Sequence, residues 1–127
     1  MANKKIIDRQ WPLSALAVIK PANVGAGLGF DVVVPPGALV TTVRVQTATA
    51  FNGTTPTATV TDGTTVFANA VDISTIGAET VANAPKYYPN GGTISINAAN
   101  AGGTTNAGLA FASIDYIVVD RGNEIVN

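Results

Sequence analysis

The chain has 127 residues, enough for one domain with a single core, and it contains no histidine and no cysteine. This composition excludes catalysis by imidazole or thiol groups and the usual zinc and iron–sulfur sites. Seven basic and eight acidic residues give a net charge of −1, which excludes a basic footprint for nucleic acid. The 15 Val, 10 Ile and 16 Thr residues favour strands, because β-branched side chains fit a pleated surface.

Charge is sparse as well as balanced. Only 12% of the residues are charged, against about a quarter in typical domains. A surface of this kind promotes association, so we expect a protein that works in an assembly and forms a homodimer or homotrimer. No apolar run is long enough to predict a membrane span, and the run at 13–19 is too short for a secretory signal.

The N-terminal segment, residues 1–12, alternates charged and apolar residues without a helical period and ends in proline. Nothing in this pattern supplies a hydrophobic face to a core. We therefore expect an extended arm, separate from the domain of residues 13–127. Ile6, Ile7 and Trp11 are available in the arm for docking on a partner. The open alternative is that Trp11 caps one end of the sandwich and that Ile6-Ile7 add an edge strand to it.

The first two strands are expected at 13–20 and 30–34, separated by a loop at 21–29 that contains three glycines. Three consecutive valines in the second strand predict that it is covered on both faces.

The sequence Pro36-Gly37 fits the central positions of a type II turn, because proline presets φ and glycine accepts a positive φ. The strand that follows, 39–50, has the clearest period of two, with Val43 and Val45 on one face and Arg44 on the other.

Strands at 57–61 and 64–68 flank Asp62-Gly63, which predicts a hairpin with a two-residue type I′ turn. In that register Ala58 lies opposite Phe67. A shift of one residue or a bulge is an open alternative.

The segment 71–81 is ambiguous between a helical turn and an irregular strand, whereas 93–98 alternates cleanly. The last strand, 108–120, changes its apolar phase, which predicts a β-bulge near Ser113. Seven or eight short antiparallel strands between Gly, Pro and Asn turns indicate an all-β, single-domain β-sandwich of jelly-roll type. Its core is expected to hold six side chains: Val43, Val45, Phe67, Ile94, Ile96 and Phe111.

An enzyme of this composition would have to use carboxylates. Asp62 is accounted for by its turn, Asp115 and Tyr116 face opposite sides of a strand, and Ser113 has no base to activate it. The oxygen-rich segment 120–124 lacks the spacing of a known calcium loop. We therefore predict no catalytic site, no metal and no cofactor.

The aromatic residues Trp11, Tyr87 and Tyr88 leave three interpretations open. In the first they stack on sugars as in a carbohydrate-binding module, in the second they anchor a protein interface, and in the third they belong to the core.

One longer pattern is more specific than any single residue. It comprises VVPPGALVTTVRV at 33–45, TAFNGT at 49–54, TVTDGT at 59–64 and YIVVD at 116–120. These segments resemble jelly-roll capsid decoration, or cement, proteins of tailed bacteriophages. The resemblance covers residues 30–68 closely and 108–120 loosely.

The resemblance implies a non-enzymatic virion protein on the outside of a phage head, assembled in the host cytoplasm. Its implied partner is the major capsid protein, which it stabilises; nucleic acid and membrane are not expected partners. Another virion component, such as a tail or fibre part, and a carbohydrate-binding module are the alternatives. The candidate partner interface comprises Lys4, Lys5, Ile6, Ile7, Arg9, Trp11, Tyr87 and Tyr88.

Overall fold

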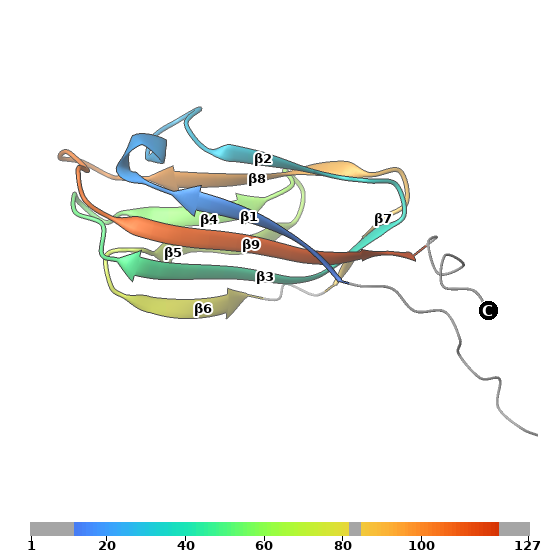
Figure 1. The fold of residues 1–127 in the computed structure, drawn as a ribbon. Helices are drawn as coiled ribbons and strands as arrows, with labels where there is room; N and C mark the ends of the chain where they lie inside the picture. The colour runs from blue at the N-terminus through green and yellow to red at the C-terminus, as the bar shows by residue number, and fades with distance from the viewer. Residues whose placement is uncertain (1–11, 82–84, 120–127) are drawn as a thin grey trace, which may run out of the picture.

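The computed structural model describes residues 12–81 and 85–119, which form nine strands and a short 3₁₀ turn, Pro21–Asn23. Figure 1 shows the strands stacked in two layers, with loops at both ends. The strands are β1 (Leu13–Ile19), β2 (Phe30–Val34), β3 (Ala38–Thr49), β4 (Thr57–Thr61), β5 (Val66–Asp72), β6 (Gly77–Val81), β7 (Lys86–Tyr88), β8 (Gly92–Ala99) and β9 (Leu109–Val118).

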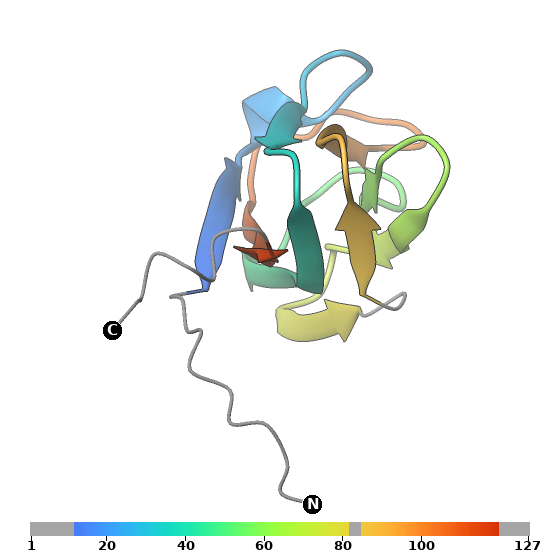
Figure 2. The same cartoon turned by 90° about the vertical axis from the view of Figure 1, so that its right-hand side faces the viewer.

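The strands pair as nested hairpins. β1 pairs with β9, β2 with β8, β3 with β6 and β4 with β5, all antiparallel. Pairing of β3 with β9 and of β4 with β8 completes two sheets, in the orders β1-β9-β3-β6 and β2-β8-β4-β5. A long hairpin rolled up in this way is a jelly roll, so the predicted fold class is confirmed. The short β7 pairs with the start of β3, at the end of the sandwich seen in Figure 2.

The turn before β3 and the alternation within β3 are both as predicted. The backbone N–H of Ala38 donates to the Pro35 carbonyl at 3.1 Å, and Gly37 has a φ of +85° that requires glycine. Along β3, Val43 and Val45 are buried while Arg44 is exposed. Local turn chemistry and a period of two therefore define this part of the sheet.

β4 and β5 form the predicted hairpin, but the predicted turn and register are wrong. The connection is a four-residue turn in which the N–H of Asp62 donates to the Thr65 carbonyl at 3.1 Å. Two irregularities in the pairing, of the kind that the sequence left open as a shift or bulge, add to the effect of the turn and place Ala58 opposite Val71, where the sequence predicted Phe67. The longer turn displaces every pair that follows it, because the register of a hairpin depends on its loop.

The core lies between the two sheets and contains five of the six predicted side chains: Val43, Val45, Phe67, Ile94 and Ile96. Phe67 is the largest of the fully buried side chains, and most of the others are isoleucines and valines from both sheets.

The sixth prediction, Phe111, is wrong. β9 alternates without a change of phase, so that Ala112 and Ile114 are buried and Phe111 is half-buried on the outer side. The irregularity that the sequence placed near Ser113 lies on the neighbouring strand, between Val40 and Thr42. Since β9 keeps a strict period of two, burial of Ile114 fixes the outward direction of Phe111.

Two further segments are defined by the structure. The ambiguous stretch 71–81 contains the end of β5 and the whole of β6. β2 is covered on one face only, because Val34 is buried whereas Val33 is 74% exposed. The expected cover on both faces is wrong, since β2 is an edge strand with one face open to solvent.

Most of the expected N-terminal arm, residues 1–11 with Trp11, lies outside the described residues, as do residues 120–127. β1 begins at Leu13, where the sequence predicted the first strand.

Gly108 is expected to be intolerant of any side chain. Its φ is +140°, and an added Cβ would lie 2.4 Å from the Phe51 ring. We expect Gly108→Ala to lower the free energy of unfolding by about 1–3 kcal/mol in urea titrations. Gly77→Ala is the control, because nothing lies within 4 Å of a Cβ there and φ is not positive. If the two substitutions lower the free energy of unfolding equally, the positive φ of Gly108 and its closeness to Phe51 do not limit the side chain at this position.

Candidate interaction surface

The two outer faces of the sandwich differ in chemistry. The outer side of the β2-β8-β4-β5 sheet is mostly hydroxyl and amide groups: Thr57, Thr59, Thr61, Thr93, Ser95 and Asn97. Asp31 joins it and accepts a hydrogen bond from the Ser95 hydroxyl at 2.8 Å. This surface is therefore mostly polar, although Val33 and Val66 are exposed on the same sheet.

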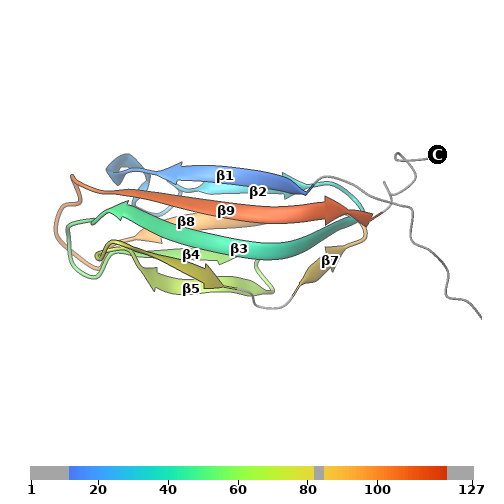
Figure 3. The same ribbon diagram turned by 60° about the horizontal axis from the view of Figure 1, so that its bottom comes forward.

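The outer side of the other sheet, which we call the β9 face, is apolar at both ends. Figure 3 brings β1, β9 and β3 side by side. Near the end of the sandwich where β1 leads into residues 20–29, which we call the loop end, Val18 lies opposite Phe111, and Leu16 on the same strand is 64% exposed. At the other end, Leu39 lies between Tyr87 and Ile117, its partners on β7 and β9.

A polar belt separates these two apolar ends. The Asp115 carboxylate accepts a hydrogen bond from the Ser14 hydroxyl at 2.8 Å and forms an ion pair with Arg44. The Thr41 hydroxyl donates to the Asp115 carbonyl at 3.1 Å. Three strands are thus joined through one side chain, which stiffens the face around its centre.

The two tyrosines of β7 have different surroundings, because adjacent residues of a strand face opposite sides. Tyr87 is 46% exposed on the β9 face, whereas Tyr88 is only 7% exposed and belongs to the core. Tyr88 is therefore removed from the candidate interface, and Tyr87 stays in it.

Tyr88 takes part in a polar cluster with Asp62, Lys86 and Thr65, which we call the Asp62 cluster. The Asp62 carboxylate accepts hydrogen bonds from the Tyr88 hydroxyl at 2.7 Å and from the N–H groups of Thr64 and Thr65 at 2.8 and 2.6 Å, and it pairs with Lys86. Lys86 also donates to the Thr65 hydroxyl at 2.9 Å. The cluster fastens the β4–β5 turn of one sheet to β7 of the other.

These contacts shift the pKa of two groups. Burial alone raises the pKa of Asp62, but the hydrogen bonds from Lys86, Thr65, Tyr88 and Thr64 outweigh burial and hold that pKa well below its usual range. Burial and the nearby Asp62 carboxylate raise the pKa of Tyr88 above its usual value. Burial and the contacts within the Asp62 cluster therefore account for the direction of both pKa shifts.

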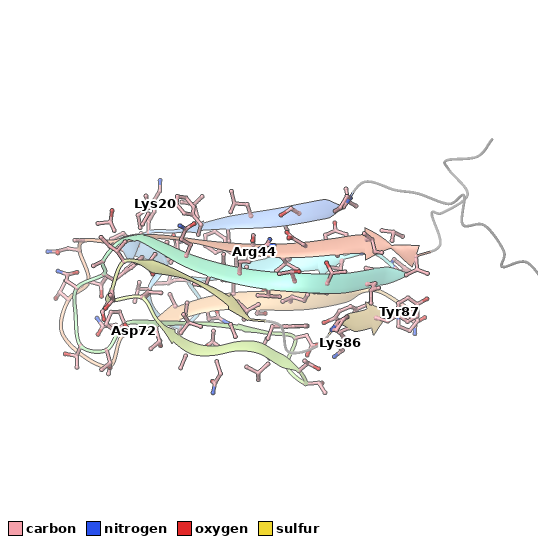
Figure 4. The ribbon with its side chains drawn as sticks, turned by 90° about the horizontal axis from the view of Figure 1, so that it is seen from below. Lys20, Arg44, Asp72, Lys86 and Tyr87 are labelled. Carbon is pink, nitrogen blue, oxygen red and sulfur yellow. The ribbon has the colours of Figure 1, made fainter. Side chains whose placement is uncertain are left out.

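The charged side chains that the structure describes are spread over the molecule. Figure 4 shows Lys20 and Asp72 near one end, Arg44 along the sheet, and Lys86 with Tyr87 at the opposite end. Asp72 accepts hydrogen bonds from its own turn, at Ser74. Within the described residues, no group of three or more carboxylate, imidazole or thiol side chains is placed to hold a metal ion. In the same part of the chain, no helix has the length and hydropathy of a membrane span.

Two hollows lie at the loop end. One, of about 370 Å³, is lined by Pro21, Val24, Gly25, Asn100, Gly103, Thr104 and Thr105, none of which is ionisable or aromatic. The other, of about 320 Å³, includes Asp72 and Ile76 among its lining residues. Neither lining brings together an acid and a base.

The candidate interface predicted from the sequence is only partly described. Tyr87 lies on the β9 face, Tyr88 is in the core, and the other six residues, Lys4 to Trp11, lie outside the described residues. Sequence reasoning missed Leu16, Val18 and Phe111 as surface residues. Their signal was present for β1, where Leu16 and Val18 alternate with Ala15 and Ala17.

No protein-family model matches the sequence, and a comparison with curated proteins gives no match. The fold therefore defines the class, a jelly-roll β-sandwich, and the β9 face is its candidate site.

Proposed function

We propose that the protein is a non-enzymatic structural component of a tailed-phage virion, which binds the outside of the head and stabilises the lattice of major capsid protein. The β9 face carries the proposal. It presents exposed Leu16 and Tyr87 with half-buried Val18, Phe111 and Ile117 on a rigid sheet. The two apolar patches lie on either side of the Asp115 belt, and exposed apolar patches that contain aromatic side chains and adjoin polar groups are typical of protein interaction sites.

The requirements of a capsid stabiliser agree with this body. A protein that binds the assembled shell in preference to free subunits stabilises the shell by mass action, and many copies multiply the effect. Such a protein needs a stiff frame and one adhesive surface. The Asp115 contacts and the Asp62 cluster provide stiffness at the centre and at one end.

The resemblance in residues 33–45 supports the same function. It spans the end of β2, the turn at Gly37 and the first half of β3. Docking of the arm, with Lys4, Lys5, Ile6, Ile7, Arg9 and Trp11, remains part of the proposal.

A carbohydrate-binding module is the second candidate. The neutral hollow lined by Asn100, Thr104 and Thr105 favours it, because amide and hydroxyl groups bind sugars without charge. The hollow lacks an aromatic platform, and Tyr87 lies at the opposite end on β7. We therefore rank it below the virion role.

Binding to purified heads that lack the protein tests the proposal. We expect Phe111→Lys to weaken co-sedimentation with heads about tenfold or more, because a charge would be buried in the contact. The control is Val33→Lys, which places the same charge at an exposed position on the other sheet. Weaker binding of Val33→Lys alone would move the interface to the other face, and a wild-type protein that ignores heads would refute the virion role.

A further inference from the structure

The structure leaves β1 with one free edge. Within the described residues β1 pairs with β9 alone, and it is the first strand in the order of its sheet. In Figure 2 the blue β1 lies at the left margin of the molecule. The unpaired N–H and C=O groups of such an edge form a template for another strand.

Natural proteins usually protect an edge with charge, proline, a bulge or short length. β1 has none of these devices, because its seven residues, LSALAVI, contain no charge and no proline and pair with β9 without a register shift. Leu16, at its centre, is one of the most exposed large apolar side chains of the described residues.

The other edge strands are protected. β2 has only five residues and carries Asp31 within the strand. β5 is interrupted at Ala70, which has a φ of +50°, and its pairing with β4 is irregular. β6 has five residues and includes Glu79 in its sequence. The contrast singles out β1.

We propose that β1 pairs antiparallel with β1 of a second copy of this chain, about a two-fold axis at Leu16. This register uses all seven residues: Leu13 faces Ile19 of the second copy, Ser14 faces Val18, Ala15 faces Ala17, and Leu16 faces Leu16. Outward residues then meet outward residues, as antiparallel pairing across one face demands.

A second copy fits this edge better than an unrelated extended segment. An isologous contact places identical residues opposite each other at the axis, so a charge near the centre would meet its own copy. β1 contains no charge. Pairing brings the two Leu16 side chains together at the axis, and each Val18 lies two residues further along the same face, opposite Ser14 of the second copy.

The chain contains no cysteine, so one introduced thiol reports on one contact. Directly opposed strand residues have Cβ atoms about 4.5–5.5 Å apart, close to what a disulfide needs. Under mild oxidation we expect Leu16→Cys to form covalent dimers about tenfold faster than Val33→Cys, a comparably exposed position on β2. Equal rates, or faster cross-linking at Val33, would overturn the proposal.

Analytical ultracentrifugation of the full chain gives the second readout and needs no phage head, so it is independent of the virion role. The wild type is expected to sediment as a dimer, and Leu16→Lys to raise the dimer dissociation constant about tenfold or more. A matched Val33→Lys variant should remain dimeric. A monomeric wild type would contradict the proposal, and a dimer that appears only when residues 2–11 are deleted would show that the arm occupies the edge instead.

Discussion

Phe67→Ala is expected to lower the free energy of unfolding by about 3–5 kcal/mol. The Phe67 ring is 1% exposed and lies in the core between the two sheets. Truncation removes its buried apolar surface and leaves a cavity that the surrounding strands fill only in part. Because domains of this size are stable by about 5–15 kcal/mol, urea titration should show a large fall in the midpoint.

Phe111→Ala is the matched control, since it makes the same chemical change on the outer side of β9. Phe111 is half-buried and does not belong to the core, so a loss of no more than about 1–2 kcal/mol is expected. If Phe111→Ala costs as much as Phe67→Ala, the phase of β9 described above is wrong.

Asp62→Asn is expected to cost about 2–3 kcal/mol at neutral pH. The substitution removes the ion pair with Lys86 and weakens the hydrogen bond from Tyr88. These losses are costly because the Asp62 side chain is only 6% exposed. Asp31→Asn is the control, because Asp31 is an exposed carboxylate that accepts a single hydroxyl hydrogen bond from Ser95. We expect little change in urea midpoint for Asp31→Asn.

The same carboxylate predicts a pH dependence. The pKa of Asp62 is lower in the folded chain than the value of about 4 expected in the unfolded chain. Its contribution is therefore complete above about pH 4 and is lost as the pH falls toward the folded pKa. Urea midpoints measured between neutral and strongly acid pH should fall less steeply for Asp62→Asn than for the wild type. Parallel profiles would show that Asp62 does not contribute in this way.

Local patterns in the sequence were sufficient for much of the fold. The Pro36-Gly37 turn and the alternation of Val43, Arg44 and Val45 depend on neighbouring residues only, and both predictions are confirmed. The β4–β5 register depends on more than its own turn. Asp62 also binds Lys86 and Tyr88, which lie 24 and 26 residues away, so a two-residue turn motif was insufficient.

The candidate site was less accessible to sequence reasoning, because its parts come from different strands. Leu16, Phe111 and Leu39 share one face of the sheet because β9 lies between β1 and β3. An apolar residue such as Phe111 is compatible with the core or with an apolar surface. The burial of Ile114 and the period of two along β9 place the Phe111 side chain on the outer side. Tyr87 and Tyr88 likewise have the same sequence signal and opposite surroundings.

A density map of the intact phage head tests the central proposal most directly. We predict the sandwich on the outer surface of the shell, with the β9 face and Tyr87 against major capsid protein and the threonine-rich face toward solvent. Density for the protein confined to the tail would contradict the account. A sandwich whose β2-β8-β4-β5 sheet, the one rich in threonine, contacts the capsid would also contradict it.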